Sequence, residues 1–241
     1  MTNPPAALPF PRGSRVVILA PHPDDETLGC GALIASARRR GLFVAVIALT
    51  DGQASHPGSR RWPPATLARV RRAELRRAMA RLGQPQSRVR FMGGQDGHLC
   101  GQDPALALRR IFYRWRATTV LVTSPLDHHV DHQAAYSLAV RATYSTEIKL
   151  ATYRVWSKPL GGARCLSRET SAKRWAMAAH RSQIGPYIAD ATDGFTFEPA
   201  LLRTMLAGPE RFELVPVSAR RPIQRGNLAS LRPVRLKCSS C

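Results

Sequence analysis

The sequence lacks long apolar runs, and its cysteines follow no paired pattern. No stretch approaches the roughly 20 apolar residues that cross a bilayer, and residues 1–13 show no basic segment followed by an apolar one, so we expect no secretory signal. The five cysteines are odd in number and widely spread, whereas a secreted disulfide framework is usually even and dense. Cys238 and Cys241 have C-x-x-C spacing but no second pair. We therefore expect a reduced, cytoplasmic protein without a transmembrane segment.

Acidic residues and lysines are both scarce. The chain has 36 Lys and Arg against 16 Asp and Glu, which gives a net charge of +20, and only four of the basic residues are lysines. Such a charge is typical of nucleic-acid-binding proteins, but it also arises when arginines simply cover solvated surfaces. No helix-turn-helix, zinc-finger or RNP-like signature accompanies the charge. A basic nucleic-acid-binding α/β module is therefore the alternative hypothesis, and it predicts binding that weakens steeply with salt.

Short β-rich runs alternate with amphipathic helical stretches along the chain. The apolar content of 44% suffices for the core of one large domain or two small ones. Strand and helix alternating at this spacing imply right-handed crossovers, so we predict an α/β fold with a mostly parallel sheet and a looser pattern after residue 184. The expected strands cover residues 15–20, 44–49, 89–92, 119–123 and 151–156, and the expected helices cover 27–40, 65–82, 104–115 and 167–181.

Two polar segments directly follow the first and fourth expected strands. Residues 21–26 read PHPDDE, and residues 127–132 read DHHVDH. Because the carboxyl ends of parallel strands meet at one edge of a sheet, we expect the two segments to lie close together where such folds place ligands. Prolines and consecutive acids make residues 21–26 a turn. Side chains of neighbours in a turn point in different directions, so Asp24 and Asp25 can serve different roles.

The second polar segment carries two histidines that can reach the same site. His129 and His132 are three residues apart at the start of an expected helix, so they lie on one face. Imidazole and carboxylate ligands around an open position make up catalytic zinc centres. Two histidines and one carboxylate also hold iron. The sequence therefore predicts a divalent metal site with Zn²⁺ as its first candidate and Fe²⁺ as the alternative.

These motifs resemble the zinc-dependent N-deacetylases of the GlcNAc-phosphatidylinositol de-N-acetylase (PIG-L, LmbE-like) family. The resemblance implies a Rossmann-like fold and a single domain over residues 1–241, with a catalytic core over 15–183 and a looser mixed α/β extension over 184–241. The chain departs from the family pattern at Pro21, where Ala is more usual, and at Gln53, where an acid is common. The matching motifs are Pro21 to Glu26, Thr50-Asp-Gly52, Arg71-x-x-Glu74-Leu75, Asp96-Gly97-x-Leu99, His129-Val-Asp-His132, Lys173 and His180-Arg-Ser-Gln183.

The resemblance also implies a role for each residue in the two polar segments. It implies that Asp24 is the general base, which accepts a proton from the attacking water. It further implies that a protonated His129 stabilises the oxyanion, while Asp131 orients His129 and raises its pKa. The metal ligands that it implies are His22, Asp25 and His132.

The implied reaction is hydrolysis of an amide that removes acetyl from an N-acetylglucosaminyl conjugate. Arg71 and Asp96 are expected to hydrogen-bond the sugar hydroxyls. The surplus of arginine suggests an anionic substrate, and no specific nucleic acid is expected. A metal hydrolase of a different amide stays open as an alternative. So do the identity of the N-acetylated sugar and the existence of a homo-oligomer.

Overall fold

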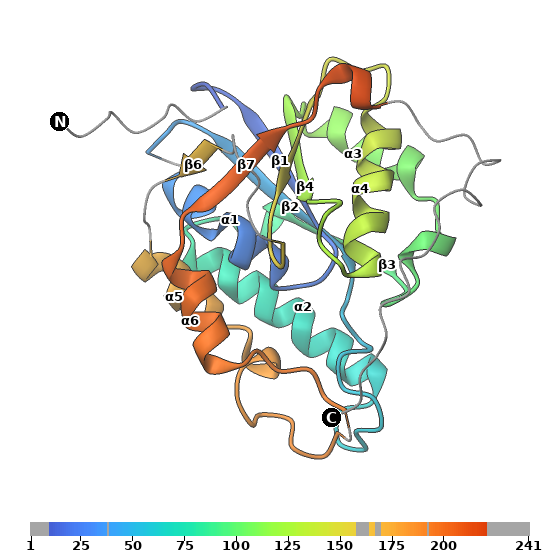
Figure 1. The fold of residues 1–241 in the computed structure, drawn as a ribbon, viewed down its shortest axis with the longest axis vertical. Coiled ribbons are helices and arrows are strands. Elements are labelled where there is room, and N and C mark those ends of the chain that lie inside the picture. Colours follow the sequence, from blue (N-terminus) through green and yellow to red (C-terminus); the bar gives the residue numbers. More distant parts are fainter. Residues whose placement is uncertain (1–9, 38, 158–163, 167–169, 192, 221–241) are drawn as a thin grey trace.

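The computed structural model describes residues 10–37, 39–157, 164–166, 170–191 and 193–220. The described strands form one sheet in the order β3-β2-β1-β4-β5-β7-β6, in which β1 to β5 run parallel and β7 is antiparallel to both neighbours (Figure 1). The predicted α/β fold with a mostly parallel sheet is confirmed. The strands are β1 (Arg15–Ala20), β2 (Phe43–Thr50), β3 (Val89–Gly94), β4 (Thr119–Thr123), β5 (Lys149–Tyr153), β6 (Arg164–Leu166) and β7 (Glu210–Leu214).

Helices cover both faces of the sheet because successive strand residues point to opposite sides. In β1, Val16 and Ile18 pack into a core with α1, α2 and α5, whereas Val17 and Leu19 pack into a second core with α3 and α4. None of the helices in the described part of the chain is long and apolar enough to span a bilayer. The helices are α1 (Asp25–Ser36), α2 (Pro64–Arg81), α3 (Ala105–Arg114), α4 (Val130–Thr143), α5 (Thr170–Met177) and α6 (Pro199–Ala207).

The order of the strands places the two polar segments side by side. From β1 the chain moves outward to β2 and β3, then returns to form β4 on the other side of β1. The carboxyl ends of β1 and β4 are therefore neighbours, with Leu19 beside Val122. A parallel sheet opens a crevice at the point where its strand order reverses in this way. Residues 21–26 and 127–132 follow these two strand ends and thus lie at that crevice.

The chain beyond residue 184, which we expected to be a looser extension, contributes α6 and β7. Glu210, the first residue of β7, is buried beside α1. Its Oε1 accepts the amide N–H of Ala32 at 2.7 Å, and its Oε2 accepts that of Leu33 at 2.9 Å. The Lys173 ammonium of α5 lies 3.1 Å from Oε1. β7 therefore holds the helix that begins at Asp25. Cys238 and Cys241 lie outside the described residues.

Removing the Glu210 carboxylate should weaken the fold strongly. We expect Glu210→Ala to lower the free energy of unfolding by about 3–5 kcal/mol, because it leaves a buried ammonium and two amides without their partner. Urea unfolding followed by circular dichroism measures this change. Glu147→Ala, at an exposed position before β5, is the matched control and should stay within about 0.5 kcal/mol of the parent. Equal small losses in both variants would contradict the role of Glu210.

Candidate metal centre and active site

The turn after β1 is held in an unusual backbone conformation at Asp24. Its φ is 146°, a backbone conformation that residues other than glycine rarely adopt and that costs on the order of 1–3 kcal/mol. The Glu26 carboxylate accepts the Asp24 N–H at 3.0 Å, and the Asp24 carbonyl accepts the N–H groups of Thr27 and Leu28 at 3.0 and 2.9 Å. These bonds hold the turn in place. They leave the Asp24 side chain free to point away from Asp25, which begins α1.

Three ligand atoms converge where β1, α1 and α4 meet. Asp25 Oδ2 lies 3.3 Å from Nδ1 of His22 and 3.3 Å from Nε2 of His132. Ligands at 2.0–2.1 Å from a tetrahedral zinc ion are about 3.3 Å apart, so the two distances from Asp25 each match a pair of zinc ligands. The His22, Asp25 and His132 side chains are 11%, 4% and 1% exposed. Burial lowers the pKa of His132, but Asp25 and Asp127 outweigh it and raise the pKa to about 9, so the site favours a positive charge.

Each of these two histidines has a carboxylate behind its other ring nitrogen. Asp127 Oδ2 lies 3.0 Å from Nδ1 of His132. Asp96 Oδ1 and Asp131 Oδ2 lie 3.1 and 3.2 Å from Nε2 of His22. Histidines that bind metals usually donate their second N–H to a carboxylate, which orients the ring. Asp127 was not among the residues expected in the site, although its place five residues before His132 is a signal that could have found it.

His129 offers a different set of ligands with His22 and His132, since ligand atoms of these three side chains lie within 4.8 Å of one another. However, His129 Nδ1 accepts the N–H of Asp131 at 3.2 Å. Burial and the neighbouring His22 and His132 lower the pKa of His129, whereas we expected a protonated ring. A neutral ring that accepts at Nδ1 carries its proton on Nε2. His129 is thus a neutral N–H donor at the cavity.

The carboxylate of Asp131 does not contact His129, where we expected it to orient the ring. Its oxygens accept the N–H groups of Gly97 and Leu99 at 2.7 and 3.1 Å, and one of them faces His22. Only the backbone N–H of Asp131 reaches His129. The reason is that Asp131 lies in the first turn of α4 against the loop after β3, so its side chain holds that loop and the His22 ring.

Asp24 faces the cavity with an arginine behind it. Arg71 Nη2 lies 2.9 Å from Asp24 Oδ2, and both side chains are buried. Burial raises the pKa of Asp24 to about 7 even though the Arg71 charge opposes this shift. A general base works best when its pKa lies near the working pH. The Asp24 carboxylate, paired with Arg71, is therefore suited to take up and release a proton near neutral pH.

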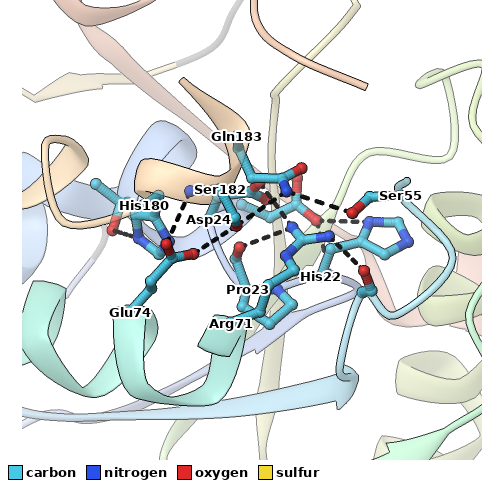
Figure 2. Close-up of polar contacts among 12 residues, drawn as sticks. His22, Pro23, Asp24, Ser55, Arg71, Glu74, His180, Ser182 and Gln183 are labelled. Carbon is cyan, nitrogen blue, oxygen red and sulfur yellow. Dashed lines mark hydrogen bonds and ion pairs between the residues drawn. The ribbon is translucent and has the colours of Figure 1, made fainter. Parts of the chain in front are cut away.

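Arg71 joins three segments of the site (Figure 2). Besides Asp24, its guanidinium donates to the carbonyls of Pro23 and Gly52, each at 2.9 Å. Arg71 is only 3% exposed, so it is not one of the solvated charges of the arginine-rich helix. We expected its donors to bind sugar hydroxyls; in the structure both terminal nitrogens bond to protein oxygens, and only the buried Nε lacks a hydrogen-bond partner. The surplus of arginine therefore includes one residue at the centre of the site.

Gly52 leaves the space that the Arg71 guanidinium fills. A Cβ added there would overlap this group, and φ at Gly52 is +63°. We expect Gly52→Ala to displace Arg71 and lower kcat/KM by about 10–100-fold, because small misplacements at a reacting centre have effects of this size. Gly83→Ala is the matched control, since φ there is +75° and nothing lies within 4 Å of its Cβ. Steady-state assays of both variants should show the loss for Gly52 alone, and equal losses would indicate backbone strain only.

Asp96 also lies at the cavity but is engaged with protein groups. Its Oδ2 accepts the N–H of Ala54 at 2.9 Å, and its Oδ1 faces Nε2 of His22. Burial would raise the pKa of Asp96, but the bonds from His22 and Ala54 outweigh it and lower the pKa to about 2. A carboxylate that stays ionised can accept a further hydrogen bond from a sugar hydroxyl. Its role in binding substrate remains a prediction.

A cavity of about 300 Å³ opens onto these groups. One side of it is aromatic, and this side was not expected from the sequence because it comes from irregular segments after β5. A usable signal was the pair Phe195 and Phe197, which would share one face of an extended segment. The lining residues are His22, Asp24, Ala54, Ser55, Arg71, Asp96, Gly97, His129, His132, Trp156, Gln183, Phe195 and Phe197.

Three further residues named by the motifs or adjacent to them lie outside the cavity lining. His180 is fully buried behind the turn, with Nε2 at 3.4 Å from Glu26 and 3.3 Å from the Thr27 hydroxyl. Cys30 is a buried free thiol in α1. His128 is exposed, and its ring lies 6.2 Å from that of Trp156. His180 thus supports the turn that carries Asp24, while His128 provides a matched control for the neighbouring site histidines.

The chain is similar to several known proteins. The chain is 27% identical over 132 residues to YaiS of Escherichia coli (strain K12), an uncharacterized deacetylase, and the match covers 53% of this chain and 66% of YaiS, just under two thirds of its length. The structure is similar to that of N,N'-diacetylchitobiose deacetylase from Pyrococcus horikoshii, with a TM-score of 0.71 and 21% identity, covering 89% of this chain and 88% of the other.

The same fold also occurs in an enzyme with a different activity. GalB, the 4-carboxy-2-hydroxymuconate hydratase from Pseudomonas putida KT2440, is 19% identical with a TM-score of 0.61, covering 70% of this chain and 80% of GalB. At such identities a similar structure establishes the fold alone. The model of the family named PIG-L, GlcNAc-PI de-N-acetylase, matches residues 17–143, which is more than half of the chain and includes both polar segments. The chain therefore belongs to the PIG-L family, a family of N-deacetylase enzymes.

Proposed function

We propose that this protein is a zinc-dependent hydrolase that removes the acetyl group from an N-acetylglucosaminyl conjugate. The observation that carries the proposal is the single Asp25 oxygen at 3.3 Å from both His22 and His132. Asp24, a base with a pKa near 7, opens onto the same cavity. Membership of a de-N-acetylase family supports the choice of the amide as the bond that is cleaved.

The ligands fit Zn²⁺ in number and type, and the two distances from Asp25 to the histidines match those between zinc ligands. His22, Asp25 and His132 would hold the ion, and three protein ligands are the usual number in a catalytic zinc centre. The chemistry that Zn²⁺ supplies in such centres is a water pKa lowered toward about 7 and polarisation of a carbonyl. Two histidines and one carboxylate also suit Fe²⁺. We propose Zn²⁺ as the resident metal, and the metal content of the purified protein tests this choice.

The remaining groups of the site would move the proton and stabilise the developing charge. Asp24 accepts a proton from the attacking water and returns it to the departing nitrogen, so that the products are acetate and a free amine. His129 donates its Nε2–H to the carbonyl oxygen as negative charge develops there. Arg71 holds the Asp24 carboxylate in place and is a positioning residue. The carboxylates behind the rings of His22 and His132 keep these rings oriented.

Acetate release from a small panel of N-acetylated sugars tests the proposal. We expect the zinc-loaded protein to release acetate from at least one of GlcNAc, N,N'-diacetylchitobiose, GlcNAc-inositol and GlcNAc glycosides. Chelation should abolish the activity, and Zn²⁺ should restore it. A zinc-loaded, folded protein that leaves every N-acetyl group of the panel intact would contradict the proposal. In that case the PIG-L fold would serve another reaction, as the fold does in GalB.

A further inference from the structure

One side of the cavity is an aromatic wall made of Trp156, Phe195 and Phe197. The Trp156 and Phe197 rings stack with centroids 5.6 Å apart and planes at 14°. The Phe195 ring meets Phe197 edge-on at 4.9 Å and Trp156 at 6.1 Å. Phe197 is 4% exposed, but Phe195 is 40% exposed. The wall therefore runs from the buried part of the cavity to its opening.

The wall is held in place by backbone contacts between loops. The N–H of Phe195 donates to the Ser55 carbonyl at 2.8 Å, and the N–H of Phe197 donates to the Gln183 carbonyl at 2.9 Å. Further along, the Asp190 carboxylate accepts the Ser59 hydroxyl at 2.8 Å and two amide N–H groups of residues 60 and 61 at 3.0 Å. The loop after β2 and the segment before α6 are thus bonded together. An exposed ring on such a fixed support is ready to bind without further ordering.

The charges at the cavity do not favour an anionic substrate group. Among the described residues that line it, Arg71 is the only lysine or arginine, and its terminal nitrogens bond to Asp24, Pro23 and Gly52. Asp24 and Asp96 also face the cavity. The Nε of Arg71 is buried without a hydrogen-bond partner, but the Arg71 charge is already paired with Asp24, so a phosphate or carboxylate on the substrate would lose water for little gain, and such burial is unfavourable. An uncharged group gains contact with the aromatic wall instead.

The direction of the substrate follows from the position of the metal ligands. The acetyl carbonyl must reach the buried end of the cavity, between Asp24 and His129. The part of the substrate on the far side of the sugar then points toward the opening, where Phe195 is exposed. We propose that the aromatic wall is a subsite for an uncharged apolar aglycone, aryl or alkyl, attached to the N-acetylated sugar. The proposal rests on the proposed deacetylase function and adds the class of its substrate.

Deacetylation of matched glycosides tests the subsite. We expect kcat/KM for 4-nitrophenyl and octyl glycosides of GlcNAc to exceed that for GlcNAc about tenfold, mainly through KM, because an aromatic contact has about this effect. GlcNAc 1-phosphate should show no such gain. Phe195→Ala should reduce the ratio of the aryl glycoside to GlcNAc about tenfold. Tyr113→Ala, which removes an exposed aromatic ring on α3, should leave both rates unchanged.

The outcomes separate this inference from the proposed function. Acetate release from all sugars with no preference for apolar glycosides, or with a preference for the phosphate, overturns the subsite and leaves the deacetylase in place. If the protein preferred N-hexanoylglucosamine to GlcNAc and Phe195→Ala removed that preference, the aromatic wall would bind the acyl chain. That result would also overturn the aglycone subsite. Calorimetry with 4-nitrophenyl glucosaminide, the amine product, tests the subsite without turnover. It should bind about tenfold more tightly than glucosamine, and equal affinities contradict the subsite.

Discussion

Replacing Asp24 with asparagine should lower kcat by about 10²–10⁴-fold while zinc stays bound, which is the range lost when a general base is removed. Asparagine is almost the same size as aspartate, so it fits the strained turn. Its amide oxygen still accepts from Arg71, which lies 2.9 Å from the native carboxylate. The asparagine side chain cannot act as a base that takes a proton from water. The measurement is acetate release at saturating substrate, together with the zinc content of the same sample.

The control for this experiment is a surface aspartate changed in the same way. Asp103 pairs with Arg141 at the surface, and its side chain is 45% exposed, so Asp103→Asn should keep both full turnover and full zinc content. If Asp24→Asn retained wild-type turnover with zinc bound, another group would be the base. If it lost zinc and activity together, Asp24 would belong to the metal set. Both results differ clearly from the one expected here.

Removing one of the proposed metal ligands should abolish both zinc binding and turnover. We expect His132→Ala to lower activity more than about 100-fold, because loss of groups that merely orient such ligands already weakens metal binding by about 10–100-fold. His132 is 1% exposed and contacts both Asp25 and Asp127, so its loss leaves these carboxylates facing an empty space. The measurements are zinc content by mass spectrometry, activity and thermal unfolding.

His128→Ala is the matched control, because His128 lies in the same segment but is exposed. It should retain zinc and activity. If His132→Ala does not fold, its zinc content says nothing about metal ligation. His132→Gln keeps more of the side-chain volume and is therefore measured in parallel. A folded His132 variant that binds zinc as tightly as the parent protein would refute the proposed ligand set. Such a result would also refute the set of His22, His129 and His132, which shares this residue, and the group of His22, Asp96 and Asp131 would be preferred.

The core of the fold and the two polar segments were predictable from the sequence because their signals are local. The run at residues 15–20 is β1 with the predicted bounds, and the run at residues 119–123 is β4. The helix predicted for residues 27–40 begins earlier, at Asp25, and ends at Ser36. Apolar runs and chain-breaking residues act within a few positions, so they locate strands and turns well. The helix ends also depend on side-chain contacts from elsewhere in the chain.

The structure shows where some of the arginines behind the net charge of +20 lie. We attributed the arginines to solvated surface or to an anionic partner. In the structure, Arg15 and Arg88 lie over the ring of Phe43 at 4.0 and 4.6 Å, and Arg76 lies over Phe91 at 4.9 Å. A guanidinium over an aromatic face is an attractive contact. These arginine side chains therefore pack against the sheet around β2 and β3.

By itself, the sequence determined the parallel α/β core and the placement of candidate ligands at the ends of two strands. Only the tertiary structure decided which partner each charged side chain has. Arg71 meets Asp24 across 47 positions, and Glu210 meets Ala32 across 178. The aromatic wall is assembled from segments on both sides of α5. Spacing along the chain specifies which residues can share a face, but contacts between distant segments depend on how the packed elements bring them together. Orientation and charge pairing therefore followed from packing alone.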